Sequence, residues 1–312
     1  MIKRTLYFGN PTYLSLKLKQ LTIKPLDELS LNKGEYKPII KSIPIEDIGI
    51  IVIDHKQITI TSALLEELLN NNCAVITCDS KHLPIGLLLP LVGNNIQNER
   101  FRHQIEASLP LKKQLWQQTI ENKIANQYHL LKYSTGELHN NMKIWSESVR
   151  SGDTDNMEAR AAAYYWKSIF PQYPDFIRGR DDGVPNNLLN YGYAILRAIV
   201  ARALVGSGLL PTLGIHHHNR YNAYCLADDI MEPYRPFVDR EVVDIINSGK
   251  SLDLSLENKA QLLRIPTIDV YINGKRSPLM VAVSQTTSSL VKCFRGEIKK
   301  ILYPKISIDE SL

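Results

Sequence analysis

Residues 187–204 read Asn-Leu-Leu-Asn-Tyr-Gly-Tyr-Ala-Ile-Leu-Arg-Ala-Ile-Val-Ala-Arg-Ala-Leu. Apolar residues recur in this segment with the spacing of an α-helix, so that they form one stripe along one side. The stripe consists of Leu188, Tyr191, Ile195, Ile199 and Ala203. The sequence Gly206-Ser-Gly208 then ends the run. The segment predicts a strongly apolar helix that packs into a core.

The chain before this helix begins with β-strand patterns. Apolar and polar residues alternate in residues 5–8, 13–18, 21–24 and 57–61, which is the period of a half-buried strand. Residues 48–54 and 74–79 are rich in β-branched residues and predict buried strands. Between them, residues 62–69 predict one short helix with Ser62 as its N-cap. We expect a compact β-rich domain, a small sandwich, in residues 1–90.

The composition changes after this region. Residues 84–98 contain several Pro, Gly and Asn residues typical of a linker, and we place the linker itself at 91–98. Helical patterns follow in residues 99–132 (divided in two by Pro110), 153–170, 187–204, a segment after Asp239 ending near Gly249, 256–263 and 284–302. Asn273-Gly274 predicts a hairpin turn. The fold class is therefore α+β, with a helical domain in residues 99–312.

Composition narrows the class of protein. With 312 residues, of which 44% are hydrophobic and 22% charged, the chain resembles a soluble globular protein. No stretch of membrane-spanning length is free of charges, so we expect no membrane segment. The four cysteines contain no Cys-x-x-Cys pair, which indicates reduced thiols and a cytoplasmic location. A net charge of +5 permits a polyanionic partner.

The densest group of potential metal ligands lies in residues 214–239. It contains the run His216-His217-His218, the pair Asp228-Asp229 and Glu232. Imidazole and carboxylate ligands suit Mn²⁺, Mg²⁺ or Zn²⁺. On a helix, Asp229 and Glu232 would share one face because they are three residues apart. The alternative is that Asp228 or Asp229 is a helix N-cap and that the histidines are surface residues.

A third ligand is needed, because hard divalent ions usually take more than one carboxylate. Glu158, on the helix predicted in residues 153–170, is the candidate. Its alternative role is a capping box with Asp155. In an extended strand His216 and His218 would point away from His217, so we expect one functional histidine.

Several motifs together resemble the CRISPR adaptation integrase, the metal-dependent member of the two universal CRISPR-associated adaptation proteins. They are Gly214-Ile-His-His217, Asp229-Ile-Met-Glu232-Pro-Tyr-Arg235-Pro236, Asn187-Leu-Leu-Asn-Tyr-Gly-Tyr193 and Met157-Glu158-Ala-Arg160. Residues 58–65, 74–79 and 99–104 are also similar, so that the likeness covers nearly the whole chain. The residues around the histidines and the acidic motif are most similar to those of members from type II systems.

The resemblance implies an N-terminal β-sandwich followed by an all-helical catalytic domain. It implies that Glu158, His217 and Glu232 bind Mg²⁺ or Mn²⁺, with Asp229 close by to hold a second ion or to orient the ligands. In other branches of the family an aspartate takes the position of Glu232.

The implied reaction is the attack of a DNA 3′-hydroxyl on a phosphodiester at the edge of a CRISPR repeat, which inserts a new spacer. Water as the attacking group would make the same site an endonuclease. The partners implied are double-stranded DNA (the prespacer and the CRISPR repeat), a second copy in a homodimer, and the smaller universal adaptation protein.

The predicted phosphate contacts are Arg178, Arg180, Arg220 and Arg235, since a guanidinium binds phosphate in fork geometry. For Arg235 the alternative is a salt bridge to a nearby carboxylate. The aromatic run Tyr164-Tyr165-Trp166 belongs either to the core or to a surface that stacks on bases.

Two other functions stay open at this point. One is a general metal-dependent nuclease of branched DNA, which would use the same site. The other is a non-catalytic DNA-binding scaffold, in which the carboxylates only cap helices.

Overall fold

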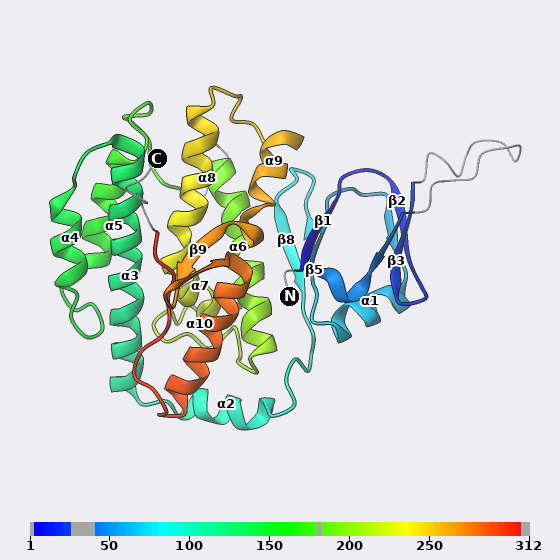
Figure 1. Ribbon diagram of the computed structural model, residues 1–312, viewed down its shortest axis with the longest axis horizontal. Coiled ribbons are helices and arrows are strands. Elements are labelled where there is room, and N and C mark those ends of the chain that lie inside the picture. The colour runs from blue at the N-terminus through cyan, green and yellow to red at the C-terminus, as the bar shows by residue number, and fades with distance from the viewer. Residues whose placement is uncertain (1–2, 26–40, 180–182, 307–312) are drawn as a thin grey trace, which may run out of the picture. The chain divides into compact units, whose positions relative to one another are not determined.

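The computed structural model describes residues 3–25, 41–179 and 183–306. The chain divides into two compact units, Met1–Gly93 and Asn94–Leu312. The division falls within residues 91–98, the segment expected to be a linker. The first unit is made mostly of strands and the second mostly of helices, so the predicted α+β class is confirmed (Figure 1).

One four-stranded sheet of the first unit has the strand order β1-β5-β7-β8. Its strands are β1 (Arg4–Phe8), β5 (Ile48–Ile53), β7 (Ala74–Cys78) and β8 (Pro84–Leu88). The first three are parallel, whereas β8 is antiparallel to β7. The linker-like composition of residues 84–88 was misleading, because Pro84 begins an edge strand, a position where its missing N–H is tolerated.

The second sheet has the order β4-β3-β2-β6. Its strands are β2 (Thr12–Lys17), β3 (Gln20–Pro25), β4 (Lys41–Pro44) and β6 (Ile58–Ile60), and the sequence patterns did not predict β4. A 3₁₀ turn (Ile45–Asp47) leads from β4 into β5 of the other sheet.

Residues from both sheets and from α1 (Ser62–Asn70) form one core. Leu14 and Leu21 of one sheet, Ile51 of the other and Leu64 of α1 are fully buried in it. The N-cap of α1 is Thr61 and not the expected Ser62, because the Thr61 hydroxyl accepts from the Leu64 amide. The first unit is thus a small sandwich with one helix, as predicted.

The second unit is built from nine described helices, one hairpin and short 3₁₀ turns. The helices are α2 (Gln97–Glu106), α3 (Leu109–Thr135), α4 (Asn140–Glu147), α5 (Met157–Ser168), α6 (Asn186–Gly206), α7 (Cys225–Met231), α8 (Arg235–Asn247), α9 (Leu256–Leu262) and α10 (Leu279–Phe294). Pro110 lies in the first turn of α3, and Ser108 caps that helix, so the chain divides there as expected. Helix α4 was not predicted, and α10 begins and ends earlier than residues 284–302.

Helix α6 lies at the centre of this unit and contacts α7, α8, α9 and α10 (Figure 1). By length and composition α6 could cross a membrane, but 83% of its most apolar window is buried within the unit. Its stripe of Leu188, Tyr191 and Ile195 is fully buried. It is therefore the core helix that residues 187–204 predicted.

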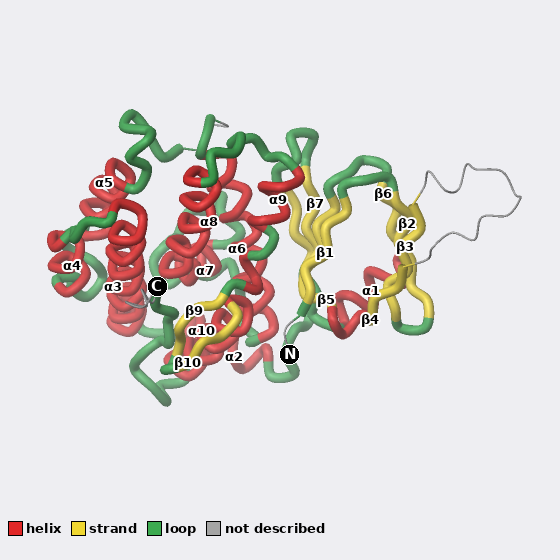
Figure 2. The backbone as a smooth tube through the Cα atoms, turned by 45° about the horizontal axis from the view of Figure 1, so that its top comes forward, coloured by secondary structure: helices red, strands yellow, loops and turns green. Residues whose placement is uncertain are grey.

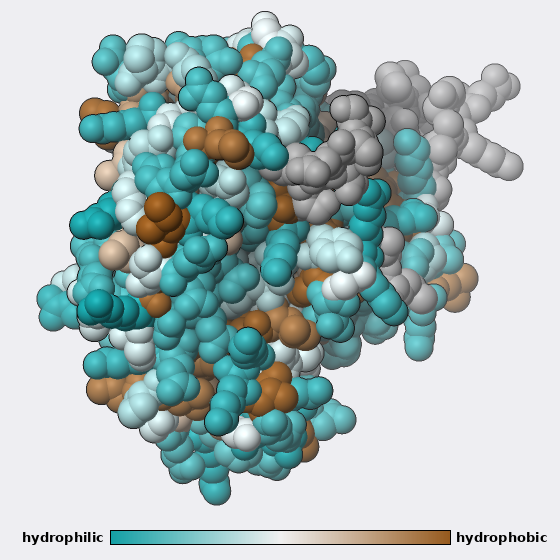
Figure 3. All heavy atoms as spheres, turned by 60° about the vertical axis from the view of Figure 1, so that its left-hand side comes forward, coloured by the Kyte–Doolittle hydropathy of each residue, from teal (hydrophilic) through white to brown (hydrophobic). Residues whose placement is uncertain are grey.

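The hairpin of β9 (Asp269–Ile272) and β10 (Lys275–Pro278) packs against α10 (Figure 2). Asn273 and Gly274 form its turn with φ angles of 50° and 75°, the backbone that Asn-Gly adopts readily. The turn is confirmed, although the domain is thereby mostly rather than entirely helical. On the face in Figure 3, hydrophobic side chains lie in small groups among hydrophilic ones.

Candidate functional site

The centre of the histidine segment is the carboxylate of Asp229, on α7. Asp229 is 0% exposed. Its Oδ2 accepts hydrogen bonds from the backbone amides of Ile215 (2.7 Å) and His216 (3.0 Å), and its Oδ1 accepts one from the His217 amide (3.2 Å). Because Asp229 lies inside α7 and binds a different segment, its interpretation as an N-cap is wrong.

The neighbouring Asp228 has another structural role. Its carboxylate accepts from Nε of Arg197 at 2.7 Å, and from Nδ2 of Asn222 at 2.7 Å. Like Asp229, it lies inside α7, whose N-cap is Tyr224. Both aspartates of the pair therefore fix the loop before α7 or its packing on α6, and neither caps the helix.

The same aspartate orients the imidazole of His217. Nδ1 of His217 hydrogen-bonds to Oδ1 of Asp229. This hydrogen bond, opposed by burial and aided by the Asp229, Glu232 and Glu158 charges, raises the pKa of His217 above 6.5. When the ring is neutral, a proton held on Nδ1 leaves the lone pair of Nε2 free, the usual arrangement of a metal-binding histidine.

The other two histidines do not share this environment. His216 stacks on the buried Trp116 of α3, with ring centroids 4.1 Å apart and an interplanar angle of 2°. Burial is the main cause that lowers the pKa of His216. His218 is exposed. Of the three histidines, His217 is thus the one whose ring is bound to a buried carboxylate.

Glu158 lies in the first turn of α5, but it does not close a capping box. Both carboxylate oxygens of Asp153 accept from the start of the helix, from the Met157 amide at 2.8 Å and the Glu158 amide at 3.0 Å. The Glu158 side chain does not cap the helix, and its Oε1 lies 2.7 Å from Nζ of Lys123. The capping alternative for Glu158 is therefore wrong.

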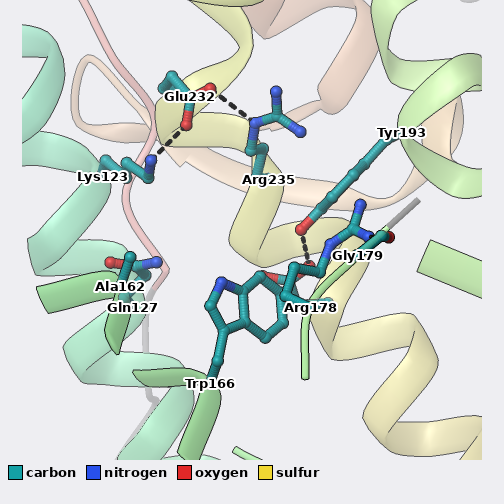
Figure 4. Close-up of a pocket in the computed structure, with 10 residues that line it drawn as sticks. Lys123, Gln127, Ala162, Trp166, Arg178, Gly179, Tyr193, Glu232 and Arg235 are labelled. Atoms are coloured by element: carbon teal, nitrogen blue, oxygen red, sulfur yellow. Dashed lines mark hydrogen bonds and ion pairs between the residues drawn. The ribbon is translucent and has the colours of Figure 1, made fainter. Parts of the chain in front are cut away.

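Glu232 lies in the 3₁₀ turn between α7 and α8 (Glu232–Tyr234) and is 5% exposed. Its Oε1 accepts from Nε of Arg235 at 2.8 Å, and its Oε2 lies 2.6 Å from Nζ of Lys123 (Figure 4). Burial alone would raise the pKa of Glu232, but the charges of Arg235 and Lys123 outweigh it and lower the pKa to about 2. The carboxylate is therefore ionised at every physiological pH.

Lys123, on α3, is buried between two carboxylates. It is 8% exposed, and its ammonium contacts both Glu158 and Glu232. Burial would lower the pKa of Lys123, but Glu232 and Glu158 outweigh it and raise the pKa. The sequence gives one indication of this burial, because Lys123 lies on the same face of α3 as Ile120 and Gln127, which are buried.

The donor set fits a hard or borderline divalent ion. Among the described residues, no three His, Cys, Asp or Glu side chains are already placed to hold a metal. Lys123 shows, however, that Glu158 and Glu232 share one cation, and Oε2 of Glu232 is buried without a well-aligned hydrogen bond. With Nε2 of His217, two carboxylates and an imidazole form a donor set that suits a hard or borderline divalent ion.

The predicted DNA-contacting arginines have different environments. Arg235 forms the salt bridge to Glu232 that its alternative interpretation described. Arg178 donates to Asn186 (3.0 Å) and Asn190 (2.8 Å). Arg220 is exposed beside Tyr221. Arg180 lies outside the described residues.

The aromatic residues of α5 lie in two environments, since Tyr165 belongs to the core and Trp166 lines a cavity. Tyr165 is fully buried, and its hydroxyl donates to Asp239 at 2.7 Å, while Tyr193 donates to the other oxygen at 2.5 Å. Burial is the first cause that raises the pKa of Asp239, to about 6. Trp166 is half-buried and lines a cavity next to Glu232 (Figure 4). Sequence patterns did not indicate this cavity.

The helical unit, which follows a strand-built N-terminal unit, places Glu158 and Glu232 beside Lys123 and Arg235, a set of charged groups suited to proteins that act on phosphodiesters. The comparisons with known proteins identify the family. The model of the family described as CRISPR associated protein Cas1 matches residues 6–266, so the chain belongs to that family. The prediction from the sequence motifs is thereby confirmed.

One relative and two solved structures illustrate the likeness. The chain is 35% identical over 291 residues to a CRISPR-associated endonuclease Cas1 of Neisseria meningitidis serogroup C, covering 93% of this chain and 91% of the relative. A casposase bound to integration product has a TM-score of 0.75 at 20% identity, with 96% and 92% coverage. A chain of a Cas6-RT-Cas1–Cas2 complex has a TM-score of 0.71 at 20% identity, with 96% of this chain and 36% of that chain covered. At these identities the two structures show the shared fold alone.

Proposed function

We propose that this protein inserts new spacers into a CRISPR array by joining a DNA 3′-hydroxyl to a phosphodiester at the edge of a repeat. Membership of the Cas1 family and the name of the 35% identical endonuclease support the class of reaction. The single observation that carries the proposal is that the ammonium of Lys123 contacts both Glu158 and Glu232. The two carboxylates therefore lie close enough to bind one cation together.

Glu158, His217 and Glu232 would hold the divalent ion, Mg²⁺ or Mn²⁺, in this proposal. When bound, such an ion polarises a phosphoryl oxygen and stabilises charge on the attacking and leaving oxygens. Asp229 bonds Nδ1 of the His217 imidazole, which would leave Nε2 available to the ion. Arg235 keeps Glu232 ionised and adds positive charge where a phosphodiester would lie.

Lys123 supplies a cation when no metal is present. Its ammonium offsets the repulsion between the Glu158 and Glu232 carboxylates, and in the loaded site it would be free to contact a phosphate oxygen. Arg178 and Arg220 add positive charge in the same unit, and they are proposed to contact the DNA backbone.

We further propose that the protein works as a homodimer together with the smaller universal adaptation protein. Inserting a DNA segment requires two joining reactions, one at each end, and a homodimer supplies two sites. The solved Cas6-RT-Cas1–Cas2 complex, which contains a chain of this fold, supports an assembly with a Cas2-type partner. Among the described residues, Cys225 and Cys293 are free thiols, which fits a cytoplasmic location.

The test is a strand-joining assay with a 3′-hydroxyl donor duplex, a supercoiled plasmid that carries the repeat, the small partner and Mg²⁺ or Mn²⁺. Joining should require the metal, be abolished by a chelator, and be lost in Glu158→Ala, His217→Ala and Glu232→Ala. Glu257→Ala, an exposed glutamate on α9, is the matched control and should retain joining.

The assay also separates the alternatives. Cleavage without joining would identify a general nuclease, and joining that is unchanged in all three variants would show that the carboxylates are not catalytic, as in a scaffold. Either outcome would overturn the proposal.

A further inference from the structure

The chain after α10 runs back beside α3 as a C-terminal strap, which we define as residues 299–306 (Figure 1). Ile301 and Ile306 of the strap are buried. Gln118 of α3 fastens its first residues, because the Gln118 amide donates to the Lys299 carbonyl at 2.9 Å and its Oε1 accepts from the Ile301 amide at 2.9 Å. The strap is therefore a fixed part of the helical unit.

Asn126 of α3 joins the strap to the 3₁₀ turn that carries Glu232. Its side chain is buried, and Nδ2 donates at 2.8 Å to the carbonyl of Pro233, the residue after Glu232. Nδ2 also donates to the Pro304 carbonyl of the strap at 3.0 Å, and Oδ1 accepts from the Ile306 amide at 3.0 Å. A carboxamide nitrogen has two hydrogens, so Asn126 uses one for the turn and one for the strap.

A second connection reaches the next residue of the same turn. The hydroxyl oxygens of Tyr234 and Thr286 are 2.6 Å apart, and Thr286, on α10, donates to the Leu302 carbonyl of the strap at 2.6 Å. A hydroxyl has one hydrogen, so Thr286 accepts from Tyr234 while it donates to the strap. Both side chains are fully buried, and solvent does not compete for these hydrogen bonds. The two residues that follow Glu232 are thus both linked to the strap.

These connections bear on where the Glu232 carboxylate lies. Asn126 is one turn after Lys123 on α3, so the helix whose lysine pairs with Glu232 also holds the turn that carries it. A shift of the turn would move Glu232 away from the ammonium that it shares with Glu158. Groups that orient metal ligands without binding the metal typically change its affinity about 10- to 100-fold.

We propose that Asn126 and Thr286 are positioning residues for the candidate metal site, and that they act by holding the Glu232 turn against the C-terminal strap. The inference rests on the proposed function in that Glu232 is taken as a metal ligand. Asn126 acts on the Pro233 carbonyl and Thr286 on the Tyr234 hydroxyl, so both act through the turn. A loosened strap should therefore weaken metal binding although every ligand is still present.

The test measures Mn²⁺ binding by the folded full-length protein, by calorimetric titration without DNA. Asn126→Ala should bind Mn²⁺ about tenfold more weakly than the wild type, as expected when an orienting group is lost. Asn122→Ala is the matched control on the same helix. The Asn122 amide donates to the Gln118 carbonyl of its own helix at 2.8 Å, so this variant should bind Mn²⁺ as the wild type does.

Thr286→Val and Thr286→Ser are the second pair, and they decide the question if Asn126→Ala does not fold. Valine has nearly the shape of threonine without the hydroxyl, so Thr286→Val should weaken Mn²⁺ binding about fivefold, the effect of one neutral hydrogen bond. Serine retains the hydroxyl, so Thr286→Ser should bind within about twofold of the wild type.

Ile306→Ala tests the strap itself, because it loosens one end of the strap and changes no residue of the turn. Alone, it should weaken Mn²⁺ binding. In the Asn126→Ala background it should add little, since the connection is already lost there. Fully additive losses in the double variant would overturn the inference.

The strap could instead stabilise the fold without affecting the metal site. Asn126→Ala and Thr286→Val would then unfold at lower temperature but bind Mn²⁺ as the wild type does, and this result would overturn the inference. A wild-type protein that binds no Mn²⁺ would overturn it as well.

Failure of the inference and failure of the proposed function give different results. Strand joining by a protein whose Mn²⁺ affinity is unchanged in these variants removes the positioning role and leaves the integrase in place. Mn²⁺ binding that depends on Asn126 and Thr286, in a protein that never joins strands, leaves the positioning role and removes the integrase.

Discussion

Oε2 of the buried Glu232 lies 2.6 Å from the ammonium of Lys123, without the alignment of a good hydrogen bond. The contact is therefore mainly one of charge. It is made in a place where the sequence motifs imply a divalent ion, so the lysine and the metal are expected to compete.

Lys123→Met tests this competition. The variant leaves the buried carboxylate of Glu232 and the half-buried one of Glu158 with less positive charge, which should destabilise the metal-free protein by about 3 kcal/mol. Mn²⁺ should bind more tightly than in the wild type and should restore most of the lost stability. Thermal unfolding and calorimetric titration measure the two effects. Lys167→Met, exposed on the same bundle, is the control, and weaker Mn²⁺ binding in Lys123→Met would contradict competition.

Asp229→Asn should weaken metal binding about 10- to 100-fold, as removal of a carboxylate behind a ligating histidine typically does. The amide can no longer hold the proton of His217 Nδ1 with a full negative charge, and the pKa of His217 should fall toward 6.5. Titration of the imidazole by NMR measures this pKa. An unchanged pKa in the variant would show that another group sets it.

Metal affinity should fall as the pH is lowered through the raised pKa of His217. Below this pKa, Nε2 carries a proton and cannot bind a metal, whereas Glu232 stays ionised because its pKa is about 2. The loss should therefore begin above pH 6.5 and steepen as the pH falls. Mn²⁺ titrations between about pH 5.5 and 8.5 measure it, and in Asp229→Asn the midpoint should move to lower pH.

Gly214→Ala should disrupt the loop that carries His217. A Cβ at position 214 would lie 2.4 Å from the His217 carbonyl oxygen and 2.8 Å from Oδ2 of Asp229. Overpacking of this kind costs about 2 kcal/mol. Thermal unfolding and strand joining should both decline. Gly183→Ala, whose Cβ would meet no described atom within 4 Å, is the control, and equal behaviour of the two variants would refute the argument.

Local patterns in the sequence predicted most of the fold. The apolar stripe of 187–204 marked the core helix, and Asn273-Gly274 marked the hairpin, because both depend on residues close together in the chain. The patterns missed β4 and misjudged residues 84–88. An edge strand needs only backbone partners, and β8 obtains them from β7 through pairings such as Thr77 with Gly86.

The candidate site, too, was predicted from the sequence only in part. Motifs indicated Glu158, His217, Asp229 and Glu232, but spacing could not decide between ligands and caps. The capping roles are excluded by Asp153, whose carboxylate accepts from the first amides of α5 in place of Glu158, and by backbone amides that come to Asp229 from another segment. Lys123 could not be assigned from its own helix, because its partners Glu158 and Glu232 are distant in sequence.

The hydrogen bonds to Asp229 bear on how many metal ions the site would hold. A carboxylate has about four lone-pair positions, and those of Asp229 are taken by the amides of residues 215, 216 and 217 and by the His217 ring. These contacts leave Asp229 no acceptor for a second ion, so we propose that it orients His217. Glu158, His217 and Glu232 are then expected to hold one ion per chain, and a two-ion reaction would need an oxygen supplied by the DNA.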